Sequence, residues 1–123
     1  EISWIDNDGQ AQLLSKQTKD YTVVIFWASW CGSCKTILPS VNEYLNSRAD
    51  VFALAVGLDD NKEDWLHEQT HYPNFNHIQA KEKWNSKTAT DYAIFATPTF
   101  YVLDKDKKII GKAKNVVELK TLF

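Results

Sequence analysis

The chain has few cysteines, little net charge and no long apolar run, and each of these scarcities excludes a class of protein. Only two of its 123 residues are cysteines, Cys31 and Cys34, so a framework of several disulfides is excluded. No apolar run approaches the ~20 residues of a membrane-spanning helix. The net charge of −2 gives no general attraction to nucleic acid or anionic lipid, so neither is an expected partner.

The composition that is present fits a folded globular protein. Apolar residues make up 44% of the chain and charged residues 24%. The length fits a single domain, 1–123, which can bury a core without metals. The chain opens on Glu1 with neither a methionine nor a signal-peptide core. We therefore expect a mature form, or a domain of a longer secreted or membrane-anchored protein.

The two cysteines share one short stretch, Trp30-Cys31-Gly32-Ser33-Cys34-Lys35. An apolar run leads into this stretch and a helical pattern leaves it. A thiol at a strand-to-helix junction lies where backbone N–H groups and the helix dipole stabilise negative charge. Helical spacing brings the second sulfur onto the same face one turn later. Because so short a loop stabilises a fold little when it is closed, the pair is predicted to be a reversible, chemically active disulfide.

Apolar patterning predicts the main elements on either side of this stretch. Two continuous apolar runs, 21–28 and 51–58, are typical of strands buried on both faces. Helical spacing predicts helices over 34–47 and 62–70, and Pro39 should kink the first of them. The shorter elements expected are strands at 2–5, 75–79, 99–103 and 108–113, and helices at 10–19, 86–92 and from Asn115 onward.

The order of these elements predicts an α/β fold. Alternating strands and helices followed by a hairpin indicate a central mixed sheet, mostly parallel, with an antiparallel pair at one side and helices on both faces. Functional groups gather beyond the carboxyl ends of the strands in such sheets. Trp30 and Cys31 lie at such an end.

Two motifs resemble the thioredoxin superfamily. They are Phe26-Trp27-Ala28-Ser29-Trp30-Cys31-Gly32-Ser33-Cys34-Lys35 and, downstream, Ala96-Thr97-Pro98-Thr99-Phe100. With a strand-helix insertion between about Leu58 and Tyr92, the chain is most similar to the TlpA/ResA-like branch of extracytoplasmic thiol-disulfide oxidoreductases. The resemblance covers almost the whole chain and implies a thioredoxin-like fold.

The resemblance also implies an activity and its setting. We expect a thiol-disulfide oxidoreductase, a reductase of protein disulfides that cycles its CxxC pair between dithiol and disulfide. The expected partners are protein thiols and disulfides, with a membrane or periplasmic thiol donor. We expect a periplasmic or otherwise extracytoplasmic monomer without cofactor or metal.

Candidate roles follow for individual residues. Cys31 is the candidate nucleophile and Cys34 the thiol that resolves the mixed disulfide. The resemblance implies a cis peptide bond at Pro98, which would expose the Thr97 backbone to an extended substrate segment. Trp30 would form an apolar platform at the rim. The exchange site is completed by two further substrate-binding candidates, Gly32 and Ser33.

Two departures from the family pattern bear on the chemistry. Ser33 stands where thioredoxins usually carry proline, so their redox poise cannot be carried over. Ile25 stands where thioredoxins have a buried acid, and Leu58, followed by Asp59 and Asp60, stands where the branch often has one. The proton acceptor for Cys34 therefore stays open.

Several alternatives compete with this interpretation. His67 and His71 are spaced to face one metal, but Cys34 lies much further from His67 than the ~12–15 residues of a zinc finger. The histidines, including His77, are expected at the surface or partly buried. Pro98 could instead be a trans proline that starts an edge strand, and Trp30 could be core. The rival functions are a binding module without turnover and an oxidant or isomerase of protein disulfides.

Overall fold

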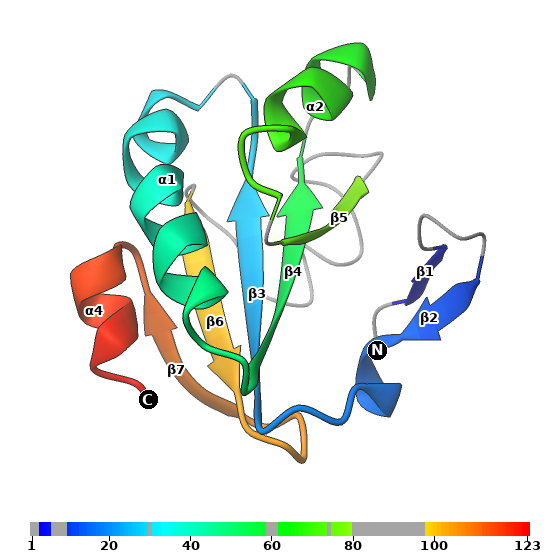
Figure 1. Cartoon of the computed structure of the whole chain (residues 1–123), viewed down its shortest axis with the longest axis vertical. Helices are drawn as coiled ribbons and strands as arrows, with labels where there is room; N and C mark the ends of the chain where they lie inside the picture. Colours follow the sequence, from blue (N-terminus) through cyan, green and yellow to red (C-terminus); the bar gives the residue numbers. More distant parts are fainter. Residues whose placement is uncertain (1–2, 6–9, 30, 59–61, 74, 80–97) are drawn as a thin grey trace.

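A five-stranded mixed sheet forms the centre of the computed structural model, which describes residues 3–5, 10–29, 31–58, 62–73, 75–79 and 98–123 (Figure 1). The strand order is β5-β4-β3-β6-β7. The strands are β3 (Tyr21–Trp27), β4 (Val51–Gly57), β5 (Asn76–Gln79), β6 (Thr99–Leu103) and β7 (Ile109–Ala113). β3, β4 and β5 run parallel, whereas β6 and β7 add an antiparallel pair on one side. The predicted α/β fold with its mixed sheet is confirmed.

The central strand β3 is buried on both faces, as its continuous apolar run predicts. Val23, Ile25 and Trp27 face a cluster of buried side chains that includes both cysteines. Val24 and Phe26 face a second cluster on the opposite side of the sheet. These five side chains are 0% exposed, so β3 anchors the core on both sides of the sheet.

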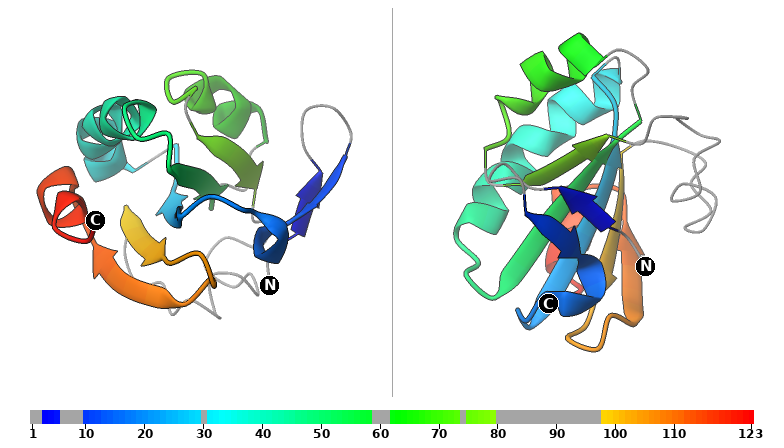
Figure 2. Two further views of the ribbon diagram at one scale, coloured as in Figure 1. Left: turned by 60° about the horizontal axis from the view of Figure 1, so that its bottom comes forward. Right: turned by 90° about the vertical axis from the view of Figure 1, so that its right-hand side faces the viewer.

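Three helices contribute buried side chains to the first of these clusters, which we call the cysteine-side core. They are α1 (Gly32–Asn46), α2 (Lys62–Gln69) and α4 (Val116–Lys120). Figure 2 shows α1 and α4 side by side over this face of the sheet. On the opposite face, Leu14 of a short 3-10 helix, η1 (Leu14–Lys16), joins the second cluster. The helix expected over 86–92 lies outside the described residues.

Helix α1 is the longest helix of the described part of the chain and contains Pro39. Its buried side chains are Cys34, Leu38, Val41 and Leu45, which recur at helical spacing. Pro39 is exposed, so its ring does not enter the core. The predicted helix is confirmed with a start two residues earlier, at Gly32.

The N-terminal prediction of a helix over Gln10 to Lys19 is wrong. Residues Ala11–Leu13 form strand β2, which pairs antiparallel with β1 (Ser3–Ile5), and η1 follows directly. Leu14 is buried while Ala11 and Leu13 are exposed, so the stripe expected for a helix buries only one residue. An interval this poor in apolar residues gains little stability from packing as a helix. Pairing with β1 is therefore the more stable arrangement.

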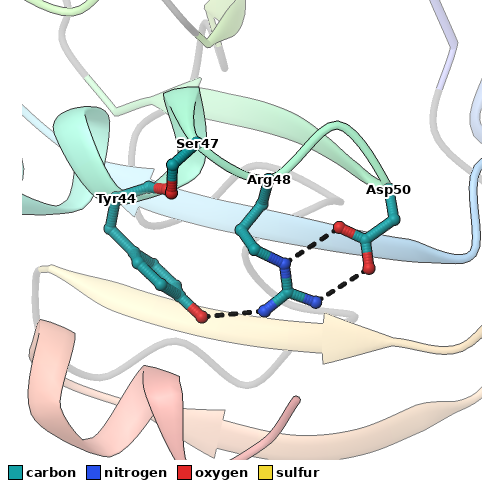
Figure 3. A network of polar contacts seen from close by, with 4 residues as sticks. All are labelled: Tyr44, Ser47, Arg48 and Asp50. Carbon is teal, nitrogen blue, oxygen red and sulfur yellow. Dashed lines mark hydrogen bonds and ion pairs between the residues drawn. The ribbon is translucent and has the colours of Figure 1, made fainter.

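An ion pair closes the connection between α1 and β4 (Figure 3). Arg48 donates two hydrogen bonds to the Asp50 carboxylate, at 2.9 and 2.8 Å, and a third to the Tyr44 hydroxyl at 2.9 Å. The Arg48 guanidinium holds the pKa of Asp50 below its usual range. The guanidinium carbon also lies 4.5 Å from the centre of the Phe123 ring, so this network ties the residues after α4 to the end of α1.

In the part of the chain that the structure describes, no helix is both long and apolar enough to cross a membrane.

Candidate functional site

The cysteine pair lies where β3 ends and α1 begins (Figure 1). Cys31 is the N-cap of α1, and its Sγ accepts a hydrogen bond from the Cys34 backbone N–H at 3.1 Å. The Cys31 N–H donates to the Ala28 carbonyl at 3.2 Å, which fixes the turn out of β3. The two sulfurs are joined in a disulfide. The strand-to-helix junction predicted from the sequence is confirmed.

The two sulfurs differ in access and share a favourable electrostatic position. Cys31 is 7% exposed, whereas Cys34 is 0% exposed and packs with the core of α1. The first turn of α1 carries no acidic residue to oppose a thiolate. The helix N-terminus and the Cys34 N–H both stabilise negative charge on the Cys31 sulfur once the disulfide opens. Gly32 and Ser33 between the cysteines are exposed, so a partner can approach there.

Pro98 is brought to the same end of the sheet by strand pairing. It is buried and immediately precedes β6. Thr99, the first residue of β6, pairs with Phe26 near the end of β3 that leads to the cysteines. Thr97 and Trp30 lie outside the described residues. The cis form of the Thr97–Pro98 bond and the roles of these two residues therefore stay predictions.

The remaining candidates are placed as follows. His67 and His71 are exposed, with ring centres 6.1 Å apart. Within the described ranges, no three His, Cys, Asp or Glu side chains group as metal ligands. Ile25 is fully buried in the cysteine-side core. Burial is expected at this position, because thioredoxins carry a buried acid there. Asp59 and Asp60 lie outside the described residues.

A group of aromatic rings belongs to the same core cluster as the cysteines, and it contacts His77, for which the sequence predicted a surface or partly buried position but no role. The Trp27 indole meets the Tyr72 ring at 5.5 Å and the His77 ring at 5.8 Å between centres. Burial, together with Glu68, raises the pKa of Tyr72 to about 12. Burial also lowers the pKa of His77 below its usual 6.5, although a bond to the Tyr72 carbonyl opposes this shift. The sequence does place His77 in a short predicted strand. Its neighbours in the fold depend on the order of the strands in the sheet, which that pattern does not give.

The lowered pKa of His77 predicts a loss of stability in mild acid. The unfolded chain binds a proton near pH 6.5, before folded His77 does, so the free energy of unfolding should decrease as the pH falls from about 6.5 through the folded pKa. Urea titrations of the wild type and His77→Gln at a series of pH values measure this. The wild type should lose more stability than the variant over the interval; parallel curves would contradict the prediction.

A cysteine pair at the N-terminus of the first long helix, with a proline at the same end of the sheet, defines the class of thioredoxin-fold exchange proteins. The family model described as thioredoxin-like matches residues 19–109, and the chain belongs to this family.

Individual relatives agree with this assignment. A thioredoxin-like protein of Fusarium culmorum is 31% identical over 115 residues, which cover 91% of this chain and 74% of the relative. Among solved structures, a domain of a possible thiol-disulfide isomerase from Cytophaga hutchinsonii is 28% identical with a TM-score of 0.77, covering 98% of this chain and 85% of the other. The thioredoxin domain of a thiol-disulfide oxidoreductase from Bacteroides vulgatus shares the fold at 22% identity and a TM-score of 0.80, covering 98% and 88%.

The site and the family together establish the general activity. The protein is a thioredoxin-like thiol-disulfide oxidoreductase whose active pair, Cys31 and Cys34, is in the disulfide form. Membership of the family implies protein thiols and disulfides as its substrates. The sequence-based prediction of an enzyme of this class is confirmed.

Proposed function

We propose that the protein reduces disulfides of partner proteins, with Cys31 as nucleophile and Cys34 as resolving thiol. The observation that carries these roles is the difference between the two sulfurs. Cys31 caps α1 and is the more exposed of the two residues, whereas Cys34 is fully buried. A partner's disulfide therefore meets Cys31 first, and Cys34 can reach only the sulfur of Cys31.

The cycle follows from these positions. The Cys31 thiolate attacks one sulfur of the partner's disulfide, so that a mixed disulfide forms and the other partner sulfur leaves as a thiolate, which takes up a proton. The Cys34 thiolate then attacks the Cys31 sulfur, the internal disulfide forms, and the second partner thiolate leaves. The partner gains two electrons and two protons, and a donor dithiol later returns them to the pair.

The proposed substrate-binding residues are Gly32, Ser33, Pro98, Thr97 and Trp30. Gly32 and Ser33 are exposed between the sulfurs, and the pairing of Thr99 with Phe26 puts Pro98 near the same strand end. An extended partner segment could pair with the backbone of Thr97 by strand addition, with Trp30 as an apolar rim. These five residues would hold the partner's disulfide over Cys31.

The reducing direction, an extracytoplasmic location and a membrane or periplasmic thiol donor rest on similarity to the TlpA/ResA-like branch. The equilibrium reduction potential tests the direction, because reductases and oxidants are far apart on this scale, with thioredoxin at about −270 mV and DsbA at about −120 mV. We expect a value near that of thioredoxin from glutathione or dithiothreitol equilibration. A value near that of DsbA would contradict the reductase proposal and indicate an oxidant instead.

An isomerase is the second candidate, and two observations favour it. The Cytophaga hutchinsonii domain, at 28% identity, is described as a possible thiol-disulfide isomerase. Ser33 also replaces the proline that is usual in reducing thioredoxins. Recovery of activity from a scrambled disulfide protein, compared with simple insulin reduction, separates the two candidates.

A further inference from the structure

His77 lies in the same row of the sheet as Ile25, the position at which thioredoxins carry a buried acid. On adjacent strands, His77 pairs with Ala55, and Ala55 pairs with Ile25. Directly paired residues project from the same face of a sheet, so His77 lies on the face that carries Ile25 and the cysteine-side core. Only the small side chain of Ala55 stands between them in this row. Cys34 packs onto the same face from α1.

The two ring nitrogens of His77 are in different situations. Nε2 lies 2.9 Å from the Tyr72 carbonyl oxygen, and because a carbonyl only accepts, Nε2 carries the hydrogen. Nδ1 is buried and has no hydrogen-bond partner among the residues that the structure describes. In the neutral ring Nδ1 therefore keeps its lone pair, which makes it a buried base.

We propose that His77 is the buried base that takes the proton of Cys34 when Cys34 attacks the mixed disulfide. The Cys34 S–H bond breaks as a bond from hydrogen to His77 Nδ1 forms, and the sulfur electron pair makes the new bond to Cys31 while the partner thiolate leaves. The imidazolium afterwards loses its proton to solvent or to that thiolate. The proposal rests on the resolving role of Cys34 given above, but not on the reducing direction of the cycle.

The surroundings of His77 suit this role. Burial keeps the imidazole neutral at neutral pH, so it is ready to accept a proton. A thiolate and an imidazolium bordering one apolar cluster stabilise each other across its low dielectric. Among the described residues, the other titratable groups nearby are Tyr72, which burial keeps protonated, Glu68, which is hydrogen-bonded to Tyr72, and the exposed His71. The contacting side chains of β3 and β4, Trp27 and Ala55, do not titrate.

Reaction of the reduced protein with an equimolar aromatic disulfide, Ellman's reagent, resolves the two steps. The first release of coloured thiolate reports attack by Cys31, and the second, which is intramolecular, reports attack by Cys34. In His77→Gln, which keeps a donor for the Tyr72 carbonyl, the second phase should slow at least about tenfold near pH 6.5. The deficit should close as the pH rises through the pKa of the thiol itself, because the base is then no longer needed.

Matched variants decide between a chemical and a structural role. His77→Phe keeps the ring contacts with Trp27 and should show the same deficit, whereas His71→Gln at the surface should behave as the wild type. A deficit of equal size at every pH, or one found in Asp59→Asn or Asp60→Asn instead, overturns the proposal. A wild type that releases only one thiolate refutes the role of Cys34 itself, whereas an unaffected second phase in His77→Gln and His77→Phe refutes only the role of His77.

Discussion

Changing Cys34 to alanine is expected to turn the protein into a covalent trap for its partners. Cys31 keeps its place at the N-cap of α1 and can still attack a disulfide, but the buried sulfur that resolves the mixed disulfide is gone. Multiple turnover in an insulin-type reduction assay should fall by about 10³-fold or more, since a nucleophilic step of the cycle is lost. Non-reducing electrophoresis with mass spectrometry should show partner proteins linked through Cys31.

The matched variant is Cys31→Ala, which leaves only the fully buried sulfur. It should trap no partner, and the doubly substituted protein should behave in the same way. Equal trapping by Cys31→Ala and Cys34→Ala would mean that both sulfurs reach partners. The assignment of the two roles would then be wrong, while the thiol-disulfide exchange class would stand.

The central strands could be predicted because burial on both faces leaves a pattern in the sequence itself. The runs at 21–28 and 51–58 contain no polar alternation, and the strands β3 and β4 lie within one residue of those bounds. The N-terminal interval leaves no such pattern. Ala11, Leu13 and Leu14 fit a weak helical stripe as well as a strand, and the partner that decides between them, β1, is a contact that local propensity does not encode.

The site divides along the same line between local and long-range information. Cys31 and Cys34 could be placed because their junction is built from adjacent elements. Family resemblance predicted that Pro98 lies near the cysteines. The structure supplies the physical reason, because Thr99, which follows Pro98, pairs with Phe26 near the end of β3. No role could be predicted for His77, because its neighbour Trp27 lies two strands away and sheet order brings the two together.

Trp27→Ala is expected to have the largest effect on stability of any single change in this region. The indole is 0% exposed and contacts Tyr72 and His77, so its removal opens a cavity in the cysteine-side core. The free energy of unfolding should fall by about 3–5 kcal/mol. Its Nε1 has no hydrogen-bond partner in the described ranges, so the loss is one of packing. Far-ultraviolet circular dichroism in urea measures it without relying on tryptophan fluorescence.

Two comparisons make this prediction specific. Leu66→Ala removes an apolar side chain that is 42% exposed on α2, and it should change stability by no more than about 0.5 kcal/mol. Trp27→Phe keeps an aromatic ring against Tyr72 and should fall between the two. A Trp27→Ala protein within about 1 kcal/mol of the wild type would mean that the core collapses around the missing indole. The cysteine-side core around Trp27 would then be adaptable. It would not hold the His77 ring in the fixed position that a buried base requires.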